Sequence, residues 1–252
     1  MTRPGVRPTV LVVAGFDPSG GAGVTRDLSA IRRAGADATA AVAALTFQSP
    51  GRFDGLFAVP AEVLRAEIAA AARAAPPAAV KVGMLGSREN VRAVADFLAS
   101  CPARAVIDPV WRASAGGSLT DDDGLAELRS VLLPLAAVLT PNAPEAGVLL
   151  GRPVRTRDDQ RAAAADLCAL GAAAVVVKGG HVEGDPAADV VADGSGVVAE
   201  IERPRLRGGI HGSGCLFSST LAAHLALGRP VAEATRLAGD AVAEAILEAS
   251  QG

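Results

Sequence analysis

Cysteine, aromatic residues and long apolar runs are all scarce in this chain of 252 residues. Its three cysteines are odd in number and far apart, which argues against a disulfide framework. The apolar runs are cut by glycine, proline or charged residues well below the roughly 20 residues that cross a bilayer, and no apolar signal segment opens the sequence. We therefore expect a cytoplasmic protein in a reducing compartment, with no membrane contact.

Strong charge is also missing, because the net charge is only -3 and the two signs are interspersed. A basic patch that would bind nucleic acid through its phosphates is therefore not indicated, and a small-molecule partner is more consistent with the sequence. No low-complexity stretch or charge block divides the chain, so we expect one domain over residues 1–252. Apolar residues make up 50% of the sequence but aromatic residues only 3%, so the core must be aliphatic.

Short apolar strands alternate with helices along most of the sequence. Residues 9–14 read TVLVVA, a nearly continuous apolar run that is typical of a strand buried on both faces of a parallel sheet. A glycine-rich loop follows, and Val24, Leu28 and Ile31 then have helical spacing. Further strands are expected over residues 39–45, 79–82, 105–107, 137–140 and 173–177, and helices over 60–74, 87–99, 121–135, 143–150, 156–170, 213–227 and 231–249.

The rhythm changes after residue 177. Residues 189–192 and 197–201, joined by Asp-Gly-Ser-Gly, predict a hairpin at an edge of the sheet. The whole pattern predicts an α/β fold of three αβα layers, in which helices cover both faces of a mostly parallel sheet.

Polar side chains closely follow the predicted strands, where the ligands of open α/β sheets bind. Each has a structural alternative when it is taken alone: Asp17 could cap a turn, Asn142 and Glu145 could begin a helix, and Met84 could be core. Their shared position at strand ends favours a common site. The set is Asp17, Gln48, Met84, Asp108, Asn142, Glu145, Lys178 and His181.

A second signal lies at the start of the helix expected from residue 213. Gly212 and Gly214 flank Ser213, and such a helix start directs unpaired backbone N–H groups and the positive end of the helix dipole at an anion. The same field would lower the pKa of Cys215, so that a thiolate could act as a base or nucleophile. The alternative is an ordinary glycine-rich helix entry with a small buried cysteine.

Together these residues indicate phosphoryl transfer. Asp108 and Glu145 are hard oxygen ligands of the kind that Mg²⁺ takes when it also binds phosphates. Lys178 supplies a positive charge for the phosphates, and the helix start supplies preorganised donors. Neither a Gly-x-x-x-x-Gly-Lys-Ser/Thr motif nor a Gly-x-Gly-x-x-Gly after the first strand occurs, so a P-loop or dinucleotide fold is not indicated.

With these motifs in register, the chain resembles the ribokinase superfamily and, within it, the hydroxymethylpyrimidine/phosphomethylpyrimidine kinases of thiamin synthesis. The resemblance implies a ribokinase-like fold, ATP and Mg²⁺ as cofactors, and two successive phosphorylations of an aminopyrimidine alcohol. The matching segments are AGFDPSGGAG (14–23) with Asp27, Gln48, KVGML (81–85), IDPV (107–110), TPNAPEA (140–146), KGGH (178–181) and HGSGC (211–215).

The resemblance also implies a role for each matching residue. The substrate ring would be surrounded by Gly15, Asp27, Gln48 and Met84, since an amide and a carboxylate pair with an aminopyrimidine edge and a thioether packs on its face. Mg²⁺ and its waters would be positioned by Asp108, Asn142 and Glu145. Lys178 would contact the nucleotide phosphates, and the transferring group would be stabilised by Gly212, Ser213 and Gly214. Cys215 would take the proton of the substrate hydroxyl.

Several positions depart from the family pattern. Phe16 replaces a Thr or Ser, Phe47 places a bulky ring beside Gln48, and Leu216 replaces a Thr after Cys215. Ser114 and Gly117 stand where the family has Lys and Asp near the phosphates. These departures leave open whether both phosphorylations are efficient. They also leave two alternatives, a pyridoxal or pyridoxine kinase and a pyrimidine-binding sensor without catalysis. The hairpin at 189–201 and the family likeness both allow a dimer, and we expect a homodimer.

Overall fold

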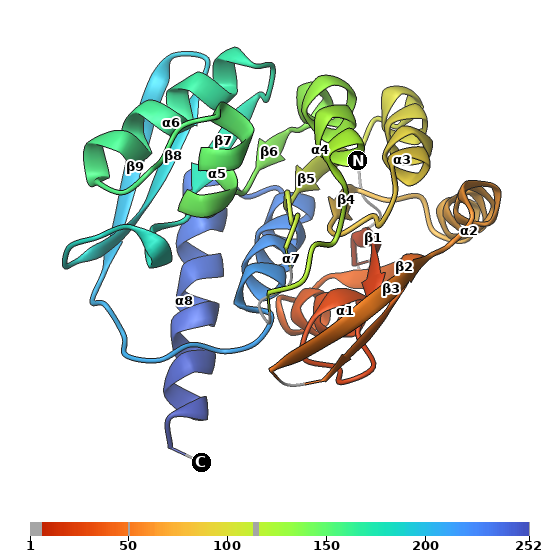
Figure 1. Cartoon of the computed structure of the whole chain (residues 1–252), viewed down its shortest axis with the longest axis horizontal. Coiled ribbons are helices and arrows are strands. Elements are labelled where there is room, and N and C mark those ends of the chain that lie inside the picture. The colour runs from red at the N-terminus through yellow and green to blue at the C-terminus, as the bar shows by residue number, and fades with distance from the viewer. Residues whose placement is uncertain (1–6, 50, 113–115, 252) are drawn as a thin grey trace.

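The chain forms one nine-stranded sheet over the residues that the computed structural model describes, namely 7–49, 51–112 and 116–251 (Figure 1). The strand order is β3-β2-β1-β4-β5-β6-β7-β8-β9. In this order, the neighbours from β2 through β1, β4, β5 and β6 to β7 pair in parallel. Strand β3 pairs with β2, β8 with β7 and β9 with β8, all in antiparallel. The bounds are β1 (Thr9–Phe16), β2 (Asp37–Ser49), β3 (Arg52–Ala58), β4 (Ala79–Val82), β5 (Arg104–Ile107), β6 (Val138–Leu139), β7 (Ala174–Val177), β8 (Ala187–Asp193) and β9 (Gly196–Arg203).

Helices cover both faces of this sheet, and the expected three-layer αβα fold is confirmed. Successive side chains of β1 alternate between two aliphatic cores, with Leu11 and Val13 in one core and Val10 and Val12 in the other. Helices α2, α3, α5 and α6 pack on the first core, and α1, α7 and α8 pack on the second. The bounds are α1 (Gly23–Arg33), α2 (Ala61–Ala74), α3 (Arg88–Ser100), α4 (Asp122–Glu127), α5 (Ala143–Leu150), α6 (Arg157–Ala169), α7 (Ser213–Ala226) and α8 (Val231–Ala249).

Two parts of the expected secondary structure were wrong. Strand β3 was missed because none of its residues is buried and Asp54 and Gly55 interrupt its apolar residues; its antiparallel pairing with the outer end of β2 defines it as a strand. The helix expected over 121–135 is three pieces: α4, a π-helical turn (Leu128–Leu132) and a 3-10 turn (Leu133–Leu135). Pro134 has no N–H to donate in the last turn, which explains the change of helix type there. The predicted edge hairpin is confirmed as β8 and β9.

A buried side chain that was not predicted connects α3 to β2 and to the loops after β3 and β4. Asn90, at the start of α3, is fully buried, and its Nδ2 lies 3.0 Å from the carbonyl oxygens of Ala43, Val59 and Leu85. These contacts tie α3 to β2 and to the loop after β4, and so fix the strand ends that bear Gln48 and Met84. No helix of the described residues is long and apolar enough to cross a membrane.

Candidate active site

A cavity of about 640 Å³ opens at the carboxyl edge of the sheet. Every predicted site residue except Asp27 lines it, although these residues come from segments that are far apart in the sequence. The lining residues from the predicted set are Gly15, Gln48, Met84, Asp108, Asn142, Glu145, Lys178, Gly212, Ser213, Gly214 and Cys215. The structure therefore brings the strand-end side chains and the start of α7 around one space.

Close packing of glycines shapes one wall of the cavity. A Cβ on Gly15 would clash with the Cε of Met84, so the thioether can reach the wall only because residue 15 has no side chain. Gly23 has a φ of 60° and packs on the carbonyl of Gly15, where a Cβ would again clash. The glycine-rich loop thus brings β1 and the start of α1 into contact beside Met84.

Phe47 does not stand beside the presumed ring, contrary to the expectation from its place next to Gln48. Side chains alternate along β2, so Thr46 and Gln48 line the cavity whereas Phe47 faces away from it and is 54% exposed. Leu216 does not line this cavity either, and its side chain is buried elsewhere. At Gly117 a Cβ would clash with the ring of Phe53, which occupies that space, and Ser114 lies outside the described residues.

Asp108, Lys178 and Glu145 form a charged cluster on the opposite wall. The Nζ of Lys178 lies 2.9 Å from Oδ1 of Asp108 and 3.8 Å from Oε2 of Glu145. Burial alone would raise the pKa of Asp108, but Lys178 and Lys81 outweigh burial and lower it. Burial raises the pKa of Glu145 to about 7 despite the neighbouring Lys178. Lys178 therefore lies near two different carboxylates: Asp108, whose pKa is lowered, and Glu145, whose pKa is near neutrality.

Asn142 and Glu145 also begin a helix, which was the structural alternative for these two residues. They form a capping box at the start of α5, in which the Asn142 side chain accepts from the Glu145 N–H at 2.9 Å. The Glu145 carboxylate in turn accepts from the Asn142 N–H at 2.7 Å. Helix capping and cavity lining are thus compatible here, because the cap fixes the carboxylate at the cavity wall.

The start of α7 carries partly buried backbone donors and has no side-chain cap. Gly212 is the N-cap residue with a φ of 74°, and its place against the backbone of Gly21 leaves no room for a Cβ. Because Gly212 has no side chain to cap the helix, the N–H groups of Ser213, Gly214 and Cys215 open the first turn uncapped. An anion held there would lie against Lys178, whose Nζ would be 3.4 Å from a Cβ built on Gly214.

The expected thiolate at Cys215 is not supported by its surroundings. Burial raises the pKa of the thiol to about 11, and the nearby Asp27 and Asp108 act in the same direction. Lys81 and the N–H of Gly23 oppose this shift without reversing it. Burial and two carboxylates brought in by other elements therefore act against the thiolate that the helix start was expected to favour.

Asp27, which was predicted to contact the substrate, lies behind the cavity wall and does not line the cavity. Its carboxylate is fully buried, 2.8 Å from the Nζ of Lys81 and 2.8 Å from the Oγ of Ser219. Lys81 is also fully buried and does line the cavity. Sequence reasoning missed Lys81, although a lysine inside the buried strand Ala-Val-Lys-Val was a signal that could have found it.

His211 and Asp17 complete the loop side of the cavity. Nε2 of His211 lies 2.8 Å from Oδ2 of Asp17, and the Asp17 carboxylate also accepts hydrogen bonds from the N–H groups of Ser19 and Ala22. Burial would raise the pKa of Asp17, but the hydrogen bonds from His211 and Ser19 lower it. Asp17 is thus both the turn cap of its structural alternative and a member of the cavity wall.

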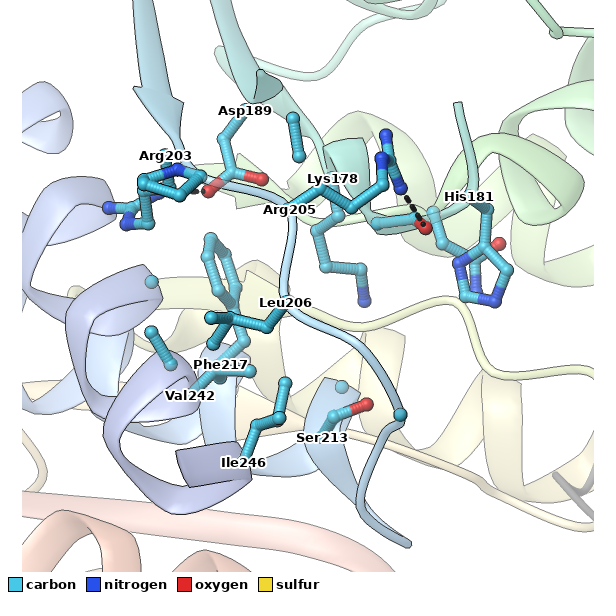
Figure 2. A pocket seen from close by; sticks show the side chains of 18 residues that line it. Lys178, His181, Asp189, Arg203, Arg205, Leu206, Ser213, Phe217, Val242 and Ile246 are labelled. Carbon is cyan, nitrogen blue, oxygen red and sulfur yellow. Dashed lines mark hydrogen bonds and ion pairs between the residues drawn. The ribbon is translucent and has the colours of Figure 1, made fainter. Parts of the chain in front are cut away.

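A second cavity of about 230 Å³ adjoins the first (Figure 2). Phe217, Val242 and Ile246 provide an apolar wall, while Arg203 pairs with Asp189 at 2.8 Å on another side. The two cavities share wall residues that include Asn142, Lys178, Ser213 and Gly214. A ligand in each would therefore meet at the start of α7.

Comparisons with known proteins agree with the geometry. The sequence profile of the family described as phosphomethylpyrimidine kinase matches residues 17–251. The hydroxymethylpyrimidine/phosphomethylpyrimidine kinase of Streptomyces coelicolor is 39% identical over 246 residues, which are 97% of this chain and 91% of that protein.

Two solved structures are similar over nearly the whole chain. One is a phosphomethylpyrimidine kinase from Clostridium difficile 630, with a TM-score of 0.83 and 29% identity over 95% of this chain and 100% of that one. The other is the pyridoxal kinase from Staphylococcus aureus in complex with pyridoxal, with a TM-score of 0.87 and 29% identity over 96% of this chain and 88% of that one.

Proposed function

Because the chain belongs to the phosphomethylpyrimidine kinase family, a family of phosphotransferases, we propose that it phosphorylates 4-amino-5-hydroxymethyl-2-methylpyrimidine with ATP and then phosphorylates the monophosphate. The observation that carries the proposal is that Gly15, Gln48 and Met84, three of the four predicted pyrimidine residues, line the same cavity as the helix start expected to bind an anion. Its relatives carry both kinase names, which supports the two steps and a place in thiamin synthesis.

The pyrimidine belongs in the larger cavity, between Gly15, Gln48 and Met84. A side-chain amide can exchange two hydrogen bonds with an aminopyrimidine edge, and a thioether packs on a flat ring. The outward direction of Phe47 leaves this space open. Asp27 supports the wall from behind instead of touching the ring.

ATP belongs in the smaller cavity, with its base against the apolar wall of Phe217, Val242 and Ile246. A related pyridoxal kinase has been described in complex with ADP and with AMP-PCP, which supports nucleotide binding by this fold. The phosphates would extend toward Lys178 and Gly214 on the shared wall, where the uncapped N–H groups of α7 are directed.

The residues present fit Mg²⁺. The carboxylates of Asp108 and Glu145 both lie near the Lys178 ammonium at the cavity wall, and carboxylate oxygens are ligands that Mg²⁺ takes. Among the described residues no group of three or more His, Cys, Asp or Glu side chains could hold a metal, and Mg²⁺ typically uses one or two carboxylates with waters and phosphates. When bound, the metal would neutralise phosphate charge.

In the reaction, the chain's own residues mainly position and neutralise. Gly212, Ser213 and Gly214 direct N–H groups at the transferring phosphoryl group, and Lys178 neutralises its oxygens. Cys215 lies at the same helix start and would accept the proton of the alcohol in its thiolate form. In the second step the acceptor phosphate is already ionised, so no protein base is required.

The pyridoxal kinase alternative is favoured by one observation, the close structural likeness to a pyridoxal kinase described with its substrate. Steady-state kinetics with both alcohols and Mg-ATP separate the two readings. A kcat/KM at least ten-fold higher for the pyrimidine supports the proposal, and a preference for pyridoxal refutes it. Absence of ADP release with either alcohol would instead support the sensor without catalysis.

A homodimer and a cytoplasmic location complete the proposal. Leu45, Phe47 and Phe57 are exposed on the outer face of β2 and β3, so this hairpin offers an apolar surface to a second copy. Cys101, Cys168 and Cys215 are free thiols, a state that is compatible with a reducing compartment such as the cytoplasm. Light scattering on the purified chain tests the dimer.

A further inference from the structure

A fully buried ion pair lies directly behind the active-site cavity. Lys81 of β4 and Asp27 of α1 are both 0% exposed, and Nζ lies 2.8 Å from Oδ2. The second oxygen of Asp27 accepts a hydrogen bond from Ser219 of α7 at 2.8 Å. Replacing a buried ion pair with apolar residues is often neutral or stabilising, so stability alone does not explain why two charges are buried here.

The position of the ammonium relates the pair to Cys215. Lys81 and Cys215 line the same cavity, and Ser219, which holds Asp27, lies one helical turn after Cys215 on α7. Gly83 makes room for the ammonium, because a Cβ there would lie 2.8 Å from Nζ. The ion pair is thus fixed by three elements, and one of them, α7, also carries Cys215 one turn before Ser219.

We propose that Lys81 is a positioning residue for phosphoryl transfer: held by Asp27 and Ser219, its ammonium stabilises the thiolate form of Cys215. The inference rests on the proposed function, because the thiolate matters only if Cys215 takes a proton from the alcohol. Asp27 acts indirectly, since it keeps Lys81 charged and in place without touching substrate.

The charges around the sulfur support this assignment. Lys81 and Lys178 are the cations near Cys215, and Asp27 and Asp108 are the anions. Burial raises the pKa of the thiol, and Lys81 is the strongest influence that opposes burial, ahead of the N–H of Gly23. Without Lys81 the thiolate would be even rarer at neutral pH.

The alcohol step transfers one proton and one phosphoryl group. The O–H bond of the substrate alcohol breaks and its proton passes to the Cys215 thiolate sulfur. The alcohol oxygen forms a bond to the γ-phosphorus of ATP while the bond from that phosphorus to the bridging oxygen breaks, which leaves ADP. The thiol then returns its proton to solvent, and Lys81 favours that return by stabilising the thiolate.

The test uses a neutral pair, Asp27→Asn with Lys81→Met, because Lys81→Met alone would leave a buried carboxylate unpaired and could prevent folding. The introduced asparagine amide can still accept from Ser219, and Met approximates the lysine stem. The matched control, Arg92→Met with Glu127→Gln, neutralises a 2.6 Å ion pair that lies outside both cavities. Circular dichroism confirms that both variants fold.

The first measurement is the rate of Cys215 alkylation by iodoacetamide at pH 8.5 in a Cys101→Ser, Cys168→Ser background without nucleotide. We expect the neutral pair to react about three-fold more slowly than the parent, because the loss of Lys81 is only partly offset by the loss of Asp27, which itself raises the pKa of the thiol, and we expect the control to match the parent. Equal or faster alkylation of the neutral pair would overturn the inference. This readout does not depend on kinase activity, so it separates failure of the inference from failure of the proposed function.

The second measurement is kcat for each phosphorylation step. The neutral pair should lose about three-fold more rate with the alcohol than with the monophosphate, because the phosphate acceptor needs no base and the loss of Lys81 outweighs the loss of Asp27 at the thiol. A merely structural role would slow both steps equally, and that result would contradict the assignment. If the parent protein phosphorylates neither acceptor, the proposed function fails while the alkylation result still decides the role of Lys81.

Discussion

The thiol of Cys215 should give the alcohol step a steep dependence on pH. Its pKa of about 11 means that only about 10⁻⁴ of the enzyme carries a thiolate at pH 7, since each pH unit below the pKa reduces the ionised fraction about ten-fold. If the thiolate is the base, kcat/KM for the alcohol should therefore rise about ten-fold per pH unit between pH 7 and 9.

The same reasoning gives the effect of removing the thiol. Cys215→Ala should slow the alcohol step by about 10²-fold or more, and Cys215→Ser should restore little, because a serine hydroxyl is a far weaker acid than a thiol. The monophosphate step should change much less and should stay nearly flat above about pH 8, because its acceptor phosphate and Glu145, whose pKa is about 7, are both ionised there.

The assay is initial rates of ADP release with each acceptor at saturating Mg-ATP, from pH 6.5 to 9.5, for the parent and both variants. The monophosphate step serves as the internal control for stability and nucleotide binding. A flat pH profile for the alcohol, or near-normal turnover by Cys215→Ala, would refute base catalysis and leave the cysteine as packing beside the helix start.

Three further substitutions test other parts of the site. Gly15→Ala should raise KM for the pyrimidine about ten-fold and leave KM for ATP unchanged, because the new methyl displaces Met84; equal effects on both KM values would contradict this. Glu145→Gln should weaken activation by Mg²⁺ at least ten-fold in a metal titration while the helix cap survives, and an unchanged titration would remove this residue from the metal set. Gly212→Ala should destabilise the fold by about 2 kcal/mol or more, seen in urea unfolding, because the residue is left-handed and against backbone; unchanged stability would show that the loop can shift.

Much of this site could be predicted because parallel strands place their ends on one edge. Asp108, Asn142 and Lys178 follow different strands, and the topology alone brings them together. An anion-binding helix start at the glycines around Ser213 could also be predicted, since a glycine-rich helix start that follows such strands is suited to binding phosphate. The fold class followed from the alternation of short apolar strands with helices.

The remainder depended on contacts between distant segments. The direction of Phe47 follows from the register of β2 against β3, a strand that local pattern did not indicate. The pKa of Cys215 depends on Asp27 and Asp108, which arrive from α1 and the end of β5. Lys81 interrupts an apolar strand, and only the buried carboxylate opposite it explains why a charge is tolerated there.

The central claim is that this cavity transfers phosphate from ATP to the aminopyrimidine alcohol. The direct measurement is a time course of the purified chain with Mg-ATP and 4-amino-5-hydroxymethyl-2-methylpyrimidine, followed by mass spectrometry and ADP release. The account predicts that the monophosphate appears first and the diphosphate second, with two ADP formed for each diphosphate. No ADP above background, or phosphorylation of pyridoxal in preference to the pyrimidine, would contradict it.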